Sequence, residues 1–422
     1  MTEPSPAEAV LEHIGVGTDI IVPMANGEPM ALLDAVEANA SNLRGVRVHQ
    51  MHALHDRDYL DGRWGDNLRH ISYFLSPVTR ERFALGQVEL VPNNFSEVPK
   101  ILSARCPDPL VLAAVSPPDR HGYFSLGTNA DYVSHLIGSA RFFVEANPEM
   151  PRTFGRNQLH MSQVVGWTER TSPLVEVPPA PPGELDLAIA TAIAERIVDG
   201  STIQTGIGAI PNAILASLSG HRNLGIHTEL ISDGIVDLVE AGVVNGVAKH
   251  LNRTKTVGTF ALGTQRLYEF LADNAAVELW PVDYVNDPRI IAREPDFVSI
   301  NATVEVDLLG QCASETIGGA YWSSSGGQAD FARGAMFSER GQGFIVLRST
   351  AKADAVSRIV GRLDAGTVVT TLKNTVDKVV TEWGVAELRG RTIRERATAL
   401  IAIAHPAHRD SLEAEGRALG YL

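Results

Sequence analysis

Short apolar runs rich in β-branched residues recur along the chain, each bounded by Gly, Pro, Asp or Asn. Apolar residues follow one another without alternation, which is typical of strands buried on both faces of a parallel sheet. Helical patterns lie between the runs, as in residues 27–43 and 414–419. This succession predicts an α/β protein. The runs are DIIVP (19–23), VELVP (88–92), PLVLAAVSPP (109–118), RFFVEAN (141–147), KTVGTFALG (255–263), GFIVL (343–347) and GTVVTTL (366–372).

A proline-rich segment, TSPLVEVPPAPPGELD at 171–186, divides the chain. Prolines disfavour helix and favour extended backbone, so this segment is the best candidate for a domain boundary. It predicts an N-terminal domain over 1–175 and a C-terminal domain over 185–422. A helix is expected directly after it, because apolar residues recur at every fourth position. This stripe consists of Leu185, Ile189, Ile193 and Ile197, and Gly200 closes the helix.

Composition narrows the class of protein. The 422 residues are 44% hydrophobic and 20% charged, as in ordinary globular proteins. The formal charge of -14 argues against a nucleic-acid or anionic-membrane partner. Cys106 and Cys312 are the two cysteines, too few for a disulfide framework, and we expect both to be core thiols. The start of the chain lacks the pattern of a signal peptide and no apolar run is long enough to span a membrane, so we expect a cytoplasmic protein.

Two glycines stand at a predicted strand–helix junction in STIQTGIGAIPNAILASL. A strand ending at Thr205 would lead into Gly206-Ile207-Gly208 and then a helix with Pro211 in its first turn. Such a loop presents backbone N–H groups to an anion or an oxyanion. A plain tight turn is an alternative. A dinucleotide site with Glu229 on a ribose is another, although Pro211 replaces the third glycine of that fingerprint.

A second glycine-rich segment runs from 300 to 335. Its VEVDL stretch alternates like a strand, and Gly326-Gly327-Gln328 ends a long loop before ADFARGA, a predicted helix start. Long loops in compact domains are more often functional than idle.

Taken together, these segments resemble the acetyl-CoA hydrolase/transferase family, the class I CoA-transferases that include acetate, butyryl and 4-hydroxybutyrate CoA-transferases. The resemblance keeps family order across nearly the whole chain. Its motifs are VSPPDRHGYFSLGTNADYV (115–133), GIGAIPNAI (206–214), IHTELISDGIVDLVEAG (226–242), SINATVEVDLLGQ (299–311), GGQADFARGA (326–335) and TEWGVAELRGRTIRERATALIAIAHP (381–406).

The resemblance implies two related open α/β domains of the CoA-transferase type, with coenzyme A and the active site between them. It implies that Glu229 is the catalytic glutamate and that Asn301 supplies a polarising carboxamide. It also implies a homo-oligomer, a dimer, acting on a small acyl-CoA and a small carboxylic acid. The implied oxyanion and CoA-binding residues are Gly206, Ile207, Gly208, Gly326, Gly327 and Gln328.

A glutamate can attack a thioester as a covalent nucleophile. The implied sequence is an acyl–glutamyl anhydride, then a glutamyl–CoA thioester, then transfer to a second carboxylate. Thioester energy is conserved, so neither a metal nor a nucleotide cofactor is expected. Because Glu229 must be ionised to attack, we expect its pKa to be ordinary or mildly perturbed. An acetyl-CoA hydrolase using the same glutamate, an NAD-dependent oxidoreductase and a non-catalytic acyl-CoA-binding protein are alternatives.

Three further features have a less definite meaning. His52 and His55 have i, i+3 spacing, but no third ligand cluster supports a metal. His227 precedes Glu229 by two residues, and packing on the opposite face is favoured over a role in tuning the glutamate. The basic segment 389–397 either meets the phosphates of coenzyme A or forms a solvated helix face.

Overall fold

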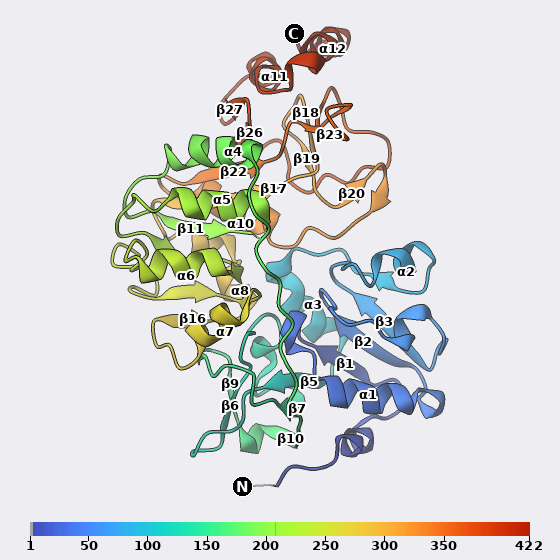
Figure 1. Cartoon of the computed structure of the whole chain (residues 1–422). Coiled ribbons are helices and arrows are strands. Elements are labelled where there is room, and N and C mark those ends of the chain that lie inside the picture. The colour runs from blue at the N-terminus through green and yellow to red at the C-terminus, as the bar shows by residue number, and fades with distance from the viewer. Residues whose placement is uncertain (1–2, 207) are drawn as a thin grey trace. The chain divides into compact units, whose positions relative to one another are not determined.

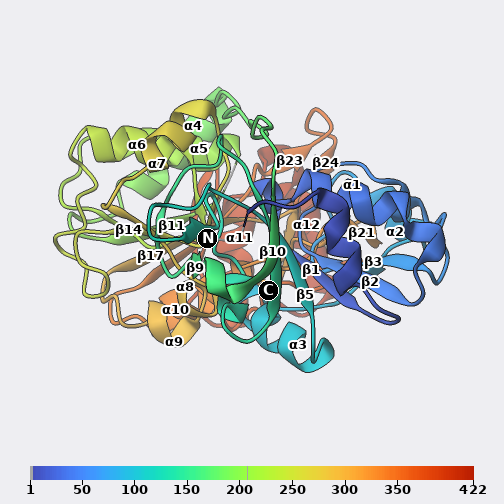
Figure 2. The same ribbon diagram turned by 90° about the horizontal axis from the view of Figure 1, so that it is seen from below.

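The computed structural model describes residues 3–206 and 208–422. They form two compact units (Figures 1 and 2), which are described separately. The first comprises residues 1–178 and 257–285, and the second comprises 179–256 and 286–422. Each contains an open sheet with helices, so the predicted α/β class is confirmed. The predicted domain ranges, 1–175 and 185–422, stay a prediction.

The first unit is built on a seven-stranded sheet with strand order β10-β7-β5-β1-β2-β3-β4. All of its pairings are parallel, as the apolar runs predict. The strands are β1 (Asp19–Val22), β2 (Val46–Gln50), β3 (Leu68–Ser72), β4 (Glu89–Leu90), β5 (Leu110–Val115), β7 (Arg141–Ala146) and β10 (Val164–Glu169). Its helices are α1 (Met30–Ala38), α2 (Arg80–Ala84), α3 (Val98–Arg105), α7 (Gln265–Leu271) and α8 (Val282–Val285). Shorter strands are β6 (Tyr123–Ser125), β8 (Phe154–Gly155), β9 (Gln158–His160), β14 (Thr256–Gly258), β15 (Phe260–Ala261) and β16 (Val277–Leu279).

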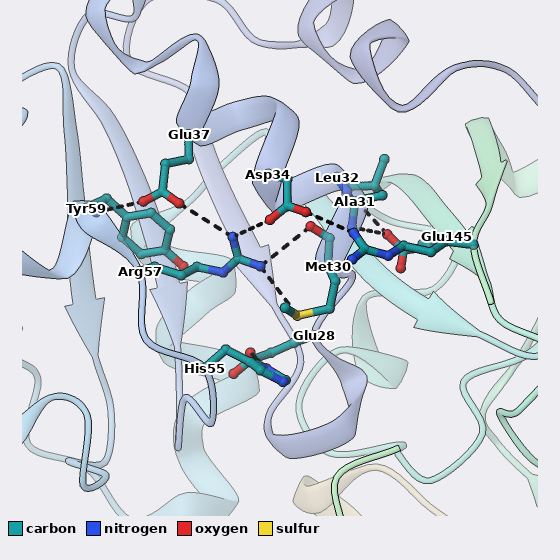
Figure 3. A network of polar contacts seen from close by, with 11 residues as sticks. Glu28, Met30, Ala31, Leu32, Asp34, Glu37, His55, Arg57, Tyr59 and Glu145 are labelled. Carbon is teal, nitrogen blue, oxygen red and sulfur yellow. Dashed lines mark hydrogen bonds and ion pairs between the residues drawn. The ribbon is translucent and has the colours of Figure 1, made fainter. Parts of the chain in front are cut away.

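Polar side chains gather beside α1 in this unit (Figure 3). The guanidinium of Arg57 is buried, and it donates to Asp34 at 3.1 Å and lies 3.6 Å from a carboxylate oxygen of Glu37. Glu145 reaches from β7 and accepts hydrogen bonds from the backbone N–H groups of Ala31 and Leu32. A carboxylate at the first turn of a helix satisfies N–H groups that have no partner within the helix. This network therefore stabilises α1 on the sheet.

The second unit contains a six-stranded sheet with order β12-β11-β17-β22-β26-β27. The pairings are parallel except for β27. We call the edge where the parallel strands end the carboxyl edge. The sheet strands are β11 (Thr202–Thr205), β12 (Gly225–Ile226), β17 (Phe297–Ala302), β22 (Gln342–Val346), β26 (Lys378–Thr381) and β27 (Gly384–Glu387). The other strands are β13 (Leu230–Ile231), β18 (Glu305–Asp307), β19 (Cys312–Ala313), β20 (Thr316–Ile317), β21 (Ala320–Tyr321), β23 (Thr350–Ala351), β24 (Val356–Ser357) and β25 (Ile359–Val360).

The helix predicted after the proline-rich segment is present as α4, and Ile189 and Ile193 of its apolar stripe are fully buried. The helix ends at Ala194, so Ile197 lies beyond it and Gly200 does not close it, and Leu185 is 43% exposed. The strand predicted to end at Thr205 is β11, and a helix containing Pro211 follows it. The unit's helices are α4 (Glu184–Ala194), α5 (Ala209–Ser217), α6 (Asp233–Glu240), α9 (Pro288–Ile291), α10 (Gln328–Phe337), α11 (Ile393–Ala402) and α12 (Pro406–Ala418).

One strand prediction is wrong. Residues 366–372 form no strand, and only Thr371 makes an isolated antiparallel bridge, to Cys312. Thr370 and Thr371 both donate backbone hydrogen bonds to the carbonyl of Cys312, so this β-branched run crosses β19 at one point instead of joining the sheet. None of the helices in the described chain has the length and apolar character needed to cross a bilayer.

Candidate functional site

Glu229 lies at the carboxyl edge of the second unit's sheet. It follows β12 and precedes β13 and the start of α6. The preceding residue, Thr228, fixes this segment to β11, because its hydroxyl donates to the carbonyl of Thr205 at 3.0 Å and accepts from the N–H of Thr205 at 3.2 Å. Two bonds to a buried strand end hold the backbone next to Glu229, so its carboxylate has a defined position.

Two groups donate hydrogen bonds to the Glu229 carboxylate. The side-chain nitrogen of Asn286 lies 2.7 Å from Oε2. The backbone N–H of Gly327, at the start of α10, is the second donor. A Cβ at position 327 would lie 2.0 Å from Oε2 of Glu229 and 2.4 Å from Nδ2 of Asn286. Residue 327 must therefore be glycine for the backbone to come this close.

The pKa of Glu229 is raised to about 7, chiefly by burial and in smaller part by the negative charge of Asp330. The hydrogen bonds from Asn286 and Gly327 act in the opposite direction, because they stabilise the charged form. The prediction of an ordinary or mildly perturbed pKa is therefore wrong, because removing water from the carboxylate destabilises its charged form. Glu229 nonetheless retains some solvent exposure.

Asn286 was not among the residues singled out from the sequence. It is fully buried, and its carbonyl oxygen Oδ1 has no hydrogen-bond partner among the described residues. The next residue, Asp287, caps α9 by accepting from the N–H of Arg289, and Pro288 occupies the first turn. The Asn-Asp-Pro signal thus predicts a helix start. It contains nothing to show that Asn286 faces a glutamate 57 positions earlier.

Asn301, the asparagine selected from the sequence, has a different partner. It lies on β17 and exchanges two hydrogen bonds, each 3.2 Å long, with the side chain of Gln204 on the neighbouring strand β11. The structure thus places the carboxamide of Asn286, and not that of Asn301, against Glu229. A role for Asn301 in polarising an intermediate stays a prediction.

The two glycine loops, at 206–208 and at 326–328, make different contacts. Gly327 contacts Glu229, and Gly326 beside it has φ +54°, a left-handed conformation that favours glycine. Gln328 begins α10 and donates to Thr371 at 3.2 Å. In the first loop, Gly208 has φ +125° and caps α5, whereas a Cβ on Gly206 would meet nothing within 4 Å. The remaining predicted oxyanion donor, Ile207, lies outside the described residues.

Comparison with known proteins identifies the family of this chain. Residues 4–171 match the N-terminal domain of acetyl-CoA hydrolase/transferase, and residues 263–416 match its C-terminal domain. The chain belongs to the acetyl-CoA hydrolase/transferase family. Succinyl-CoA:cyclohexane-1-carboxylate CoA transferase of Geobacter metallireducens is 45% identical over 98% of this chain and 94% of its own length. The 4-hydroxybutyrate coenzyme A transferase of Clostridium kluyveri is 43% identical over 96% of this chain and 95% of its own. The crystal structure of RipA from Yersinia pestis has a TM-score of 0.92 and 36% identity, and the match covers 100% of this chain and 98% of that one.

This member of the acetyl-CoA hydrolase/transferase family has one group of side chains with metal-ligand spacing among its described residues, and it lies in the first unit. Asp19, His49 and Cys106 meet there, with His49 Nε2 at 3.0 Å from Asp19 and 3.6 Å from the Cys106 sulfur. Burial raises the pKa of the Cys106 thiol to about 12, so the three groups can satisfy one another as a hydrogen-bonded core cluster. Both cysteines are free and buried, as predicted.

Two other candidates from the sequence, His227 and the basic segment 389–397, contact neighbouring side chains of the protein. His227 is fully buried and meets Phe297 edge-on, with the ring centroids 6.2 Å apart. In the basic segment, Arg389 lies 3.5 Å from Asp377 and Arg391 lies 3.8 Å from Glu395. Each of these two arginines therefore lies near an acid, and Asp377 is shared with Lys378, whose Nζ is 2.7 Å away.

Proposed function

We propose that this protein is a CoA-transferase that moves coenzyme A from a small acyl-CoA to a carboxylic acid, with Glu229 as the covalent nucleophile. The observation that carries the proposal is the state of the Glu229 carboxylate. A carboxylate can accept about four hydrogen bonds. Glu229 accepts two from donors within its own unit, and it retains some exposure to solvent. The group is therefore held in position while lone pairs remain for attack.

The reaction balances without an external energy source. A carboxylate oxygen of Glu229 attacks the thioester carbonyl, the carbon–sulfur bond breaks, and CoA leaves as a thiolate with an acyl–glutamyl anhydride in place. The thiolate then attacks the glutamyl carbonyl, releasing the first acid and forming a glutamyl–CoA thioester. A second carboxylate attacks this thioester, which breaks the carbon–sulfur bond, expels the CoA thiolate and forms a new anhydride. The returning thiolate then takes the new acyl group and frees Glu229.

Neighbouring groups suit these steps. Each attack forms a tetrahedral oxyanion, and backbone N–H groups stabilise such an oxyanion when they are fixed in advance. Gly327 and the loop at 206–208 are the proposed sources, and Asn286 orients the nucleophile through its 2.7 Å hydrogen bond. The raised pKa of Glu229 also favours reaction, because a more basic carboxylate is a better nucleophile and the acylated forms carry no charge at this buried position.

Chemical trapping tests the proposal directly. The protein would be incubated with acetyl-CoA alone, treated with borohydride, and digested for peptide mass analysis. Reduction of a glutamyl thioester to the alcohol should mark the peptide at Glu229. The same preparation should transfer CoA to at least one member of a panel of short carboxylic acids. An unmodified Glu229 in a preparation that transfers CoA would refute the covalent mechanism.

Hydrolysis is the second candidate, because the family includes hydrolases and water can replace the acceptor acid. Excluding water from the anhydride makes a transferase, and admitting it makes a hydrolase. The two are separated by the rate of CoA release with and without an acceptor. Equal rates would identify a hydrolase that uses the same glutamate.

The remaining parts of the proposal concern coenzyme A as a substrate, the cofactor requirement, the cellular location and the oligomeric state. Coenzyme A takes part as a substrate, and the proposed chemistry uses neither a metal nor a nucleotide cofactor. Activity lost on chelation and restored by a divalent ion would contradict this. A cytoplasmic location and a homodimer stay predictions.

A further inference from the structure

A cavity of about 270 Å³ opens at the carboxyl edge of the second unit's sheet. The first turn of α5, from Gly208 to Pro211, forms one wall. The residues that end β17 and β22 form the others, and Asp186, Arg348 and Arg358 complete the lining. The cavity is thus lined both by charged side chains and by apolar residues at the ends of two strands.

The position of this cavity follows from the topology of the sheet. From β11 the chain adds β12 on one side, and it then returns to add β17, β22 and β26 on the other. The direction reverses between β11 and β17. In open α/β sheets, ligands bind outside the carboxyl ends of the strands at such a reversal. The cavity is lined by the residues that follow β11 and β17, so it lies at this point.

Glu229 lies on the same edge, after β12. Two strand spacings separate β12 from β17, which is roughly 10 Å. A substrate whose reactive end meets Glu229 and whose other end occupies the cavity must therefore be elongated. The arm of an acyl-CoA, with its thioester at one end and its phosphates at the other, has this form.

The two arginines of the cavity differ in charge balance. Arg348 makes a paired contact with Asp186, with Nε at 2.9 Å from Oδ1 and Nη2 at 2.7 Å from Oδ2, and the carboxylate of Asp186 is fully buried. Arg358 has no side-chain hydrogen bond or ion pair with any described residue, and it is partly exposed. The charge of Arg348 is thus neutralised within the protein, whereas that of Arg358 remains available to an anion.

From these observations we infer that Arg358 binds a phosphate group of the nucleotide portion of coenzyme A. The inference rests on the proposed function, since it assigns the far end of the same substrate. A guanidinium presents several N–H donors in a plane, which matches the geometry of phosphate oxygens. The basic segment 389–397 is a weaker candidate for this role, because Arg389 and Arg391 lie near acids.

Steady-state transfer with two donor substrates tests the inference. Arg358→Gln should raise the KM for acetyl-CoA by roughly 10- to 100-fold, on the scale of one charged hydrogen bond. The KM for acetyl-pantetheine, which lacks the nucleotide and its phosphates, should stay the same. Arg358→Lys should restore part of the affinity for acetyl-CoA. Arg362→Gln is the matched control, because it removes an exposed arginine that lines a different cavity.

Each outcome is decisive. An unchanged KM for acetyl-CoA in Arg358→Gln, or an equal rise for acetyl-CoA and acetyl-pantetheine, would overturn the inference. Acetyl-dephospho-CoA distinguishes the phosphates. If the effect of the substitution persists with it, Arg358 meets the pyrophosphate, and if the effect disappears, Arg358 meets the 3′-phosphate. If the unmodified protein transfers CoA and Arg358→Gln has an unchanged KM for acetyl-CoA, this inference alone is refuted. If the unmodified protein does not transfer CoA, the proposed function is refuted.

Discussion

Glu28 in the first unit and Glu229 in the second are both acids near the carboxyl edge of a parallel sheet. Glu28 follows β1, and its side chain is only 2% exposed. It accepts hydrogen bonds from the side chain of Gln50 at 2.9 Å, the N–H of Leu54 at 2.6 Å and the ring of His55 at 2.5 Å. Figure 3 shows Glu28 beside His55 in the network around α1. Glu229 has two donors and more solvent exposure.

The difference in donors and exposure between Glu28 and Glu229 indicates which buried acid is available to react. A perturbed pKa is not enough, because burial also raises the pKa of Asp131 to about 7. Asp131 is fully buried and accepts from Met24 N–H, Val133 N–H and the side chain of Asn129. Its lone pairs are committed to joining chain segments. Glu229 has a similar pKa but retains capacity for a new bond, which supports its proposed role as the nucleophile.

The largest expected effect separates the two glutamates. Glu229→Ala should lower transfer by at least about ten-thousand-fold, because the covalent route is lost entirely. Glu28→Gln should instead lower the free energy of unfolding by about 1–3 kcal/mol, since one of its donors would face an amide N–H₂. Transfer kinetics and urea denaturation of both variants measure this. Substantial activity in Glu229→Ala, or lost activity in a fully folded Glu28→Gln, would break the comparison.

The next effect tests the close approach of the backbone to Glu229. Gly327→Val should lower kcat by roughly 10²- to 10³-fold, because a Cβ 2.0 Å from Oε2 must displace either the N–H donor or the carboxylate. Gly220→Ala is a suitable control, since a Cβ there meets nothing within 4 Å. If Gly327→Val transferred CoA at the normal rate, the contact would have no role in catalysis.

A smaller effect distinguishes the two asparagines. Asn286→Ala should lower kcat by about 10- to 100-fold, as expected for one hydrogen bond to a charged group. Asn301→Ala removes the reciprocal amide pair with Gln204, so we expect a loss of stability of about 1–2 kcal/mol and little change in kcat. Parallel measurement of kcat and melting temperature would reveal this division. The reverse pattern would support the prediction that Asn301 is the polarising carboxamide.

The sequence predicted most helices and strands of the second unit, because each of them depends mainly on residues close to it in the chain. The apolar stripe of α4, the strand ending at Thr205 and the helix after Gly327 all have signals within about ten residues. Asn286 could not be found this way. Its approach to Glu229, 57 positions earlier, depends on how α9 packs on α10 and how α10 packs on β17 and β22. The prediction of the pKa of Glu229 was wrong for the same reason, since burial is a property of the assembled unit.

The smallest predicted effect concerns pH and separates Glu229 from Asp131. Glu229 attacks only when ionised, so kcat/KM should be constant well above pH 7 and fall as the pH drops through about 7. Asp330 raises this pKa by repulsion, so Asp330→Asn should move the acid limb of the profile to lower pH. Near pH 6 this variant should therefore lose a smaller share of its maximal rate than the unmodified protein does. A purely structural role for Asp330 would lower kcat/KM equally at every pH and leave the limb in place. Titration of Asp131 near the same pH should not appear in the profile, because its carboxylate is fully buried and accepts hydrogen bonds from its own unit. A limb that stayed near pH 7 in Asp330→Asn would exclude Asp330 as the source of the repulsion.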